Sequence, residues 1–194
     1  MISWCFRLLL KANGWQYDAD LTKQYDKCVV IVAPHTSFLD FIYGKAIFDT
    51  IGVPAKFAIK KELFFFPFSV LFKRLGGIAI DRTPKNGDTT RISLTEAMIN
   101  MIQQQDKICL VITPEGSRSS KEQWRTGFYH IAKNAKVPLI LGSLDFKTKK
   151  GYANTLFEFT DDFDADMRRI MEFYKDKIHL GRFPKRGSLD KRFV

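Results

Sequence analysis

Two short apolar runs, each closed by a proline, constrain the fold of this chain more than any other feature. Residues 28–33 read CVVIVA before Pro34, and residues 108–113 read ICLVIT before Pro114. A half-buried strand alternates apolar and polar residues, so a run that is apolar throughout suits a strand covered on both faces. Both runs therefore predict central strands of a sheet that has helices on each side.

The remaining segments alternate between helical and extended patterns. The expected helices cover residues 2–12, 39–50, 89–104, 124–135 and 163–177, with Asp88 as the N-cap of the third. The other expected strands cover residues 55–60, 77–81 and 138–144, and residues 145–159 are expected to form a hairpin that turns at 149–151. Helices that alternate with strands indicate an α/β fold. We expect one domain over residues 1–194, with a mixed, largely parallel β-sheet flanked by helices.

Composition and charge narrow the class of protein. Hydrophobic residues make up 45% of the chain and it has only three cysteines, which excludes a disordered chain and a disulfide scaffold. The formal net charge of +10 attracts anions such as nucleic acid, lipid headgroups, phosphorylated cofactors and acidic carrier proteins. No apolar stretch approaches the roughly 20 residues of a membrane-spanning helix. Residues 2–10 are apolar but lack the cleavage site of a secretory signal.

The first candidate site follows the first apolar run. His35 lies in the connection after the strand, and Asp40 is five residues further on. An imidazole can act as a general base when a neighbouring carboxylate fixes its tautomer and stabilises the imidazolium. Five helical steps separate two side chains by about 140°, so the pair meets only if His35 lies in the loop and Asp40 in the first helical turn. The alternative is an ordinary helix start, with Thr36 or Ser37 as the cap and Asp40 favouring the helix dipole.

The second candidate site follows the second apolar run, at residues 114–119 (PEGSRS). Gly116 permits close approach of the backbone, and the planar guanidinium of Arg118 suits a phosphate. Ser117 and Ser119 add hydroxyl donors. The alternative is an ordinary polar turn between a strand and a helix.

A third candidate is a positive pocket for phosphate, which forms if Lys61 and Arg82 lie at the same end of the sheet. The alternative is a surface ion pair between Asp81 and Arg82, which contributes little to stability. Between Lys61 and Arg82, five phenylalanines occur within residues 64–72. Such residues are most often core, but beside lysines they are also typical of a loop that dips into a membrane interface.

Four short sequence motifs follow one another along the chain. They are His-x4-Asp at 35–40, a Gly-x-Ile-x-Ile-Asp-Arg-like block at 76–82, Glu-Gly-Ser-Arg at 115–118 and Val-Pro-Leu-Ile at 137–140. Together they resemble the motif blocks of the lysophosphatidic acid acyltransferase family, the glycerolipid O-acyltransferases, and in particular its compact bacterial members. The motif-bearing core is residues 28–144. Two residues depart from the usual motifs: Pro34 replaces the commoner Asn, and Ser117 the commoner Thr.

The resemblance implies a role for each matching residue and a glycerolipid acyltransferase-like fold. His35 would be the general base and Asp40 the carboxylate that orients it. The residues that would bind the substrate and its phosphate are Lys61, Arg82, Glu115, Gly116, Ser117 and Arg118. The family's chemistry implies no metal and no permanently bound cofactor.

The implied reaction transfers a fatty acyl group from a thioester, on coenzyme A or acyl carrier protein, to the free hydroxyl of a lysophospholipid such as 1-acyl-glycerol-3-phosphate. The protein would sit peripherally on the cytoplasmic face of the inner membrane, through a short amphipathic helix at residues 1–14 and the phenylalanine segment. Two alternatives stay open. The acceptor could be a phosphate-free aminoacyl lysolipid (lyso-ornithine or lyso-glycine lipid), or the chain could be a non-catalytic module that binds anionic lipid. Nucleic acid is not the expected partner, because no basic stripe with interleaved aromatic residues stands out.

Overall fold

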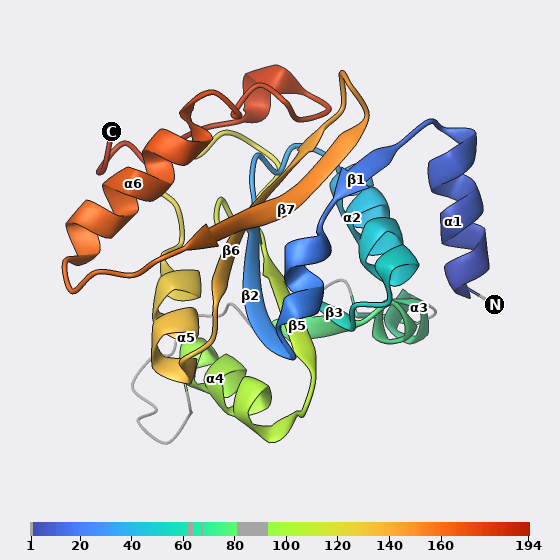
Figure 1. Cartoon of the computed structure of the whole chain (residues 1–194), viewed down its shortest axis with the longest axis horizontal. Coiled ribbons are helices and arrows are strands. Elements are labelled where there is room, and N and C mark those ends of the chain that lie inside the picture. The colour runs from blue at the N-terminus through green and yellow to red at the C-terminus, as the bar shows by residue number, and fades with distance from the viewer. Residues whose placement is uncertain (1, 62–63, 67, 81–92) are drawn as a thin grey trace.

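The computed structural model describes residues 2–61, 64–66, 68–80 and 93–194, which fold around a central β-sheet (Figure 1). The strands are β1 (Gln16–Asp18), β2 (Lys27–Val32), β3 (Ala55–Lys60), β4 (Gly77–Ile80), β5 (Ile108–Ile112), β6 (Leu139–Asp145) and β7 (Lys150–Phe157). They form a seven-stranded sheet in the order β1-β7-β6-β2-β5-β3-β4. Every neighbouring pair is parallel except β6 and β7, which are antiparallel. The expected mixed, largely parallel sheet is confirmed.

Helices cover both faces of the sheet. They are α1 (Ile2–Ala12), α2 (Phe38–Ile51), α3 (Phe68–Arg74), α4 (Leu94–Gln104), α5 (Gly127–Ala135) and α6 (Phe163–Lys175), with short 3-10 helices at Asp20–Gln24 and Pro184–Arg186. Helices α4, α5 and α6 pack on one face, whereas α1 and α2 pack on the other. Because β2 lies between them, its Val29 and Ile31 point into the first core and its Cys28 and Val30 into the second. This burial explains why the strand is apolar at every position.

Several expected boundaries differ from the structure. The hairpin turns over residues 146–149 rather than 149–151, because Lys150 already pairs with Asp145 and β7 starts there. Asp145 fixes this turn by accepting hydrogen bonds from the backbone N–H groups of Lys147 and Thr148, at 2.8 and 3.1 Å. Helix α4 has Ser93 as its N-cap, with a capping box from Glu96. The expected cap Asp88 lies outside the described residues.

One strand and one α-helix were not expected, and helix α5 starts later than predicted. The sequence patterns did not indicate strand β1 or helix α3, which have three and seven residues. Helix α5 begins at Gly127 instead of residue 124. The C-terminal segment holds the residues before it: the Trp124 carbonyl oxygen, which in a longer helix would accept from the backbone N–H of Phe128, instead accepts a hydrogen bond from Arg192 at 3.0 Å.

The sheet topology brings the two candidate loops together. Strands β2 and β5 are parallel neighbours, with Ile31 opposite Ile112 near their carboxyl ends. The loop that carries His35 leaves β2 at this edge, and the Glu-Gly-Ser-Arg loop (residues 115–118) leaves β5 beside it. The carboxyl ends of parallel strands are where ligands bind in open α/β sheets. The site is therefore expected at this edge.

Candidate active site

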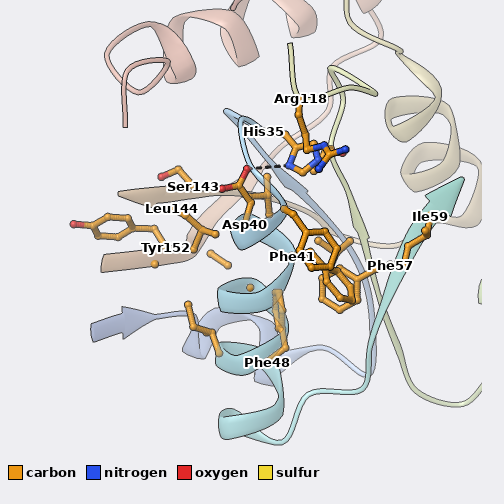
Figure 2. Close-up of a pocket in the computed structure, with 18 of the residues that line it drawn as sticks. His35, Asp40, Phe41, Phe48, Phe57, Ile59, Arg118, Ser143, Leu144 and Tyr152 are labelled. Atoms are coloured by element: carbon orange, nitrogen blue, oxygen red, sulfur yellow. Dashed lines mark hydrogen bonds and ion pairs between the residues drawn. The ribbon is translucent and has the colours of Figure 1, made fainter. Parts of the chain in front are cut away.

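His35 and Asp40 form a hydrogen-bonded pair. His35 lies in the loop between β2 and α2, and Asp40 lies in the first turn of α2, where Ser37 is the N-cap. The His35 Nδ1 atom is 3.0 Å from Asp40 Oδ2 (Figure 2). His35 in the loop and Asp40 in the first helical turn are the positions that the five-residue spacing requires if the two side chains are to meet.

The same aspartate also closes the start of the helix. Its Oδ2 atom accepts hydrogen bonds from the backbone N–H groups of Thr36 and Ser37, at 2.7 and 2.9 Å. Asp40 completes a capping box with Ser37, which confirms the helix-start interpretation, and the same carboxylate contacts His35 as a general-base pair would require. The capping contacts hold the carboxylate rigidly, and the rigid carboxylate orients the imidazole.

The hydrogen bond fixes which nitrogen of His35 can act as a base. An ionised carboxylate only accepts hydrogen bonds, so the proton of the neutral imidazole belongs on Nδ1. That leaves a lone pair on Nε2, and no residue in the described ranges hydrogen-bonds to it. His35 lines a cavity, which gives a bound molecule access to this side chain.

Glu115 supports the histidine loop from the protein interior. It is 3% exposed, and its Oε2 atom accepts a hydrogen bond from the backbone N–H of His35 at 2.6 Å. Burial raises the pKa of Glu115 to about 8, and the Asp40 charge adds to the shift, while the backbone N–H groups of His35 and Ser188 oppose it. The sequence placed Glu115 among the substrate contacts, but its side chain is not among those that line the cavity.

The next three residues of this loop do line the cavity. Gly116 adopts a left-handed φ of 65°, and a Cβ atom there would come within 2.8 Å of the Arg125 side chain. Ser117 turns its hydroxyl toward the backbone oxygen of Ser119, at 3.0 Å. Arg118 is exposed and lies beside His35 in Figure 2, and within the described part of the chain no carboxylate pairs with it. Its guanidinium is therefore open to an anion next to the imidazole.

The cavity itself has a volume of about 520 Å³ and is largely apolar. Its walls come from β2, α2, β3, α3, β5, β6 and β7. The large side chains in them include Phe41, Phe48, Phe57, Ile59, Phe72, Leu144 and Tyr152. Figure 2 shows His35 and Arg118 at one end and Phe48 at the other. A mostly apolar cavity with a few polar groups at one end is typical of a small-molecule site.

The phenylalanine segment divides between the interior and the surface. Phe72 of α3 is 7% exposed, lines the cavity and packs against Phe41, with ring centroids 6.4 Å apart. Phe65 and Phe66 are 56% and 83% exposed. Part of the segment therefore belongs to the core and part is exposed, and contact of the exposed part with a membrane stays a prediction.

The structure describes only one member of the third candidate group. Lys61 is exposed just after β3 and is not among the residues that line the cavity. Arg82 lies outside the described residues. Within the described ranges, no group of three or more His, Cys, Asp or Glu side chains could hold a metal ion. The described helices are also all too short or too polar to cross a membrane.

Comparisons with known proteins agree with the geometry. Residues 18–141 match the profile of a family described as Acyltransferase. A 1-acyl-sn-glycerol-3-phosphate acyltransferase of Streptococcus pneumoniae is 30% identical over 132 residues, which cover 68% of this chain and 47% of that protein. The chain thus spans about half the length of this curated relative.

A solved structure shares the fold. The crystal structure of the 1-acyl-sn-glycerophosphate (LPA) acyltransferase PlsC from Thermotoga maritima matches with a TM-score of 0.59 at 14% identity, over 89% of this chain and 74% of that one. The match confirms the α/β architecture. The family profile covers β2, β5 and both loops of the cavity. The chain therefore belongs to the acyltransferase family.

Proposed function

We propose that the protein transfers a fatty acyl group from an acyl thioester to the free hydroxyl of a lysophospholipid such as 1-acyl-glycerol-3-phosphate. The observation that carries this proposal is the His35–Asp40 pair at one end of an apolar cavity, with Arg118 beside it. The imidazole supplies a base, the guanidinium an anion site and the apolar walls a place for acyl chains. Coenzyme A and acyl carrier protein are both candidate carriers of the donor.

One proton moves in the proposed reaction, and His35 carries it from the acceptor hydroxyl to the departing sulfur. Nε2 of His35 takes the proton of the acceptor hydroxyl while the hydroxyl oxygen attacks the thioester carbonyl carbon. The carbon–sulfur bond then breaks, and the departing sulfur takes the proton back from the imidazolium. The products are a new ester and a free thiol, and Asp40 stabilises the imidazolium while it exists.

Arg118 is the proposed partner of the acceptor phosphate. A planar guanidinium binds a phosphate through two parallel hydrogen bonds, which positions the acceptor as well as attracting it. Lys61 and Arg82 are proposed as further phosphate contacts. Gly116 and Ser117 would shape the same end of the cavity.

The protein is also proposed to act at a membrane surface, peripherally on the cytoplasmic face of the inner membrane. Helix α1 exposes Trp4 and Leu8, at 67% and 51%, while its Leu9 and Leu10 pack toward the core. The exposed Phe65 and Phe66 add a second apolar surface, and the net charge of +10 favours anionic lipid. Binding to anionic liposomes should weaken with added salt; flotation that is insensitive to salt and to lipid charge would contradict the electrostatic part of this proposal.

The test is thiol release from palmitoyl-coenzyme A in the presence of liposomes that carry lysophosphatidic acid. Wild type should release thiol only with the acceptor present, and His35→Ala should lose about 10²–10⁴-fold in rate. His130→Ala is a matched control, because His130 is exposed on α5 and does not line the cavity. Equal activity of wild type and His35→Ala would rule out the proposed base.

Arg118→Ala distinguishes between the two kinds of acceptor. A raised KM for lysophosphatidic acid is expected if the guanidinium binds the phosphate. Unchanged kinetics, or transfer only to a phosphate-free lyso-ornithine or lyso-glycine lipid, would instead favour the aminoacyl lysolipid. If palmitoyl-coenzyme A is inactive, the same set is repeated with acyl carrier protein as the carrier.

A further inference from the structure

The chain after α6 returns across the edge of the sheet where the site lies. We call residues 180–192 the C-terminal strap; Figure 1 shows this segment crossing above the ends of the central strands. It contacts the histidine loop at Thr36, whose side chain is fully buried. The Thr36 hydroxyl oxygen accepts a hydrogen bond from the backbone N–H of Phe183 at 3.2 Å, and its carbonyl oxygen accepts one from Arg186 at 3.5 Å.

The strap also approaches this loop too closely for any side chain to intervene. A Cβ atom on Gly181 would lie 2.6 Å from the Thr36 hydroxyl oxygen and 3.2 Å from Pro34. The contact is therefore direct packing of the strap against the residue next to His35. Thr36 in turn donates its backbone N–H to Asp40, so it belongs to the same hydrogen-bonded unit as the imidazole.

The strap contacts the second loop through Ser188 and Asp190. Ser188 accepts hydrogen bonds from the backbone N–H of Lys121 at 2.9 Å and from the indole N–H of Trp124 at 3.0 Å. The buried Asp190 accepts from the backbone N–H of Trp124 at 3.0 Å, and Arg192 donates to the Trp124 carbonyl oxygen at 3.0 Å. These bonds fix the end of the loop that begins with Glu115.

Glu115 lies between these two sets of contacts. It holds the backbone of His35, and the backbone N–H of Ser188 faces it from the strap. Thr36, Glu115 and Ser188 are not among the residues that line the cavity. Their hydrogen bonds therefore join the strap to the two loops without offering a contact to a bound substrate.

We propose that the C-terminal strap is a positioning element of the acyl-transfer site, which holds the His35 loop at Thr36 and the Arg118 loop at Ser188 and Asp190. This inference rests on the proposed function. The two loops come from different strands, and loops without secondary structure of their own need outside contacts to keep a fixed geometry. A displacement of about 1 Å between reacting groups can cost about 10²-fold in rate.

The test removes the Thr36 hydroxyl, which accepts the hydrogen bond from the strap, and keeps the shape of the side chain. Thr36→Val removes the hydroxyl that Phe183 donates to, and keeps the backbone N–H that Asp40 accepts. We expect kcat to fall about tenfold or more, with KM for the thioester within about twofold, because the strap does not touch substrate. Thr36→Ser keeps the acceptor and should recover most of kcat. Lys185→Ala is the control, since Lys185 is exposed on the strap and makes none of these bonds.

A second readout does not depend on turnover. In ¹⁵N spectra of the imidazoles, His35 of the wild type should show the tautomer with its proton on Nδ1. In the Thr36→Val protein, His35 should show a mixture of the two neutral tautomers. If Thr36→Val does not fold, Ser188→Ala takes its place.

The two proposals can fail separately. Absence of turnover in wild type with every donor and acceptor would count against the proposed function, and the His35 signals alone then decide the role of the strap. Where turnover is measurable, a folded Thr36→Val protein with wild-type kcat overturns the positioning role. Without turnover, unchanged His35 signals overturn it.

Discussion

Replacing Glu115 by glutamine should change how the stability of the protein depends on pH. The carboxyl is buried, and it is faced by the backbone N–H groups of His35 and Ser188, the Asp40 carboxylate and the Tyr174 hydroxyl. Desolvation and the neighbouring negative charge favour the neutral acid, which raises the pKa of Glu115 from 4.5 to about 8. Glutamine has nearly the same shape but cannot ionise.

The sign and size of the effect follow from proton linkage. Between pH 4.5 and 8 the folded protein keeps a proton on Glu115 that the unfolded chain has released. Stability therefore falls as pH rises through this window, by about 1.4 kcal/mol per pH unit, and stops falling above about pH 8. From pH 5.5 to 7.5 the wild type should lose about 2–3 kcal/mol relative to Glu115→Gln. Below pH 4.5 the two proteins should respond to pH in parallel.

Urea unfolding followed by tryptophan fluorescence at pH 5.5, 6.5 and 7.5 measures this difference. Glu122→Gln is the control: Glu122 is exposed, and its ion pair with Lys191 lowers its pKa. It is ionised in both states over this range, so its effect should not change with pH. If the stability difference between Glu115→Gln and wild type stays constant from pH 5.5 to 7.5, Glu115 is ionised in the folded protein and the reasoning is wrong.

Three further substitutions test other parts of the site. Asp40→Asn should lower the transfer rate by about 10²–10⁴-fold, because the amide cannot stabilise the His35 imidazolium, and a bell-shaped or shifted pH–rate profile would show the altered base. Tyr174→Phe removes a fully buried hydroxyl that joins β2 to β6 through the Ile31 and Gly142 carbonyl oxygens, each at 3.0 Å. It should cost about 1–3 kcal/mol in unfolding free energy, and a melting temperature equal to wild type would contradict this. Gly116→Ala should lower activity by displacing Arg118, since φ is 65° and the new Cβ would meet Arg125; a crystal structure with an unmoved loop would argue against that explanation.

The local parts of the site could be predicted from the sequence. The spacing of His35 and Asp40 requires one loop and one helical turn, and Ser37 is a good cap, so the local sequence is enough to predict that the two side chains lie close together. Likewise, the two apolar runs predicted the central strands β2 and β5 because burial on both faces leaves no polar position. The weakest predictions were for short elements. The seven residues of α3 give too little periodicity to separate a helix from a loop.

The contacts made by Glu115 and the strap could not be predicted in the same way. Glu115 is 80 residues from His35, and Thr36 is 147 residues from Phe183. The spacing of these residues in the sequence does not indicate either hydrogen bond. The bond from His35 to Glu115 forms because β2 and β5 are neighbours, and the bond from Phe183 to Thr36 depends on the path of the chain after α6.

The sequence by itself determined the order of the motifs. It also determined the alternation of strands and helices and the proximity of His35 and Asp40, because these depend on side chains only a few residues apart. The tertiary structure decided the rest. It brought the two loops to one edge of the sheet, built the cavity walls from seven helices and strands and turned Glu115 inward. These features arise from packing between distant segments, whose partners are selected by the whole core rather than by any one stretch of the chain.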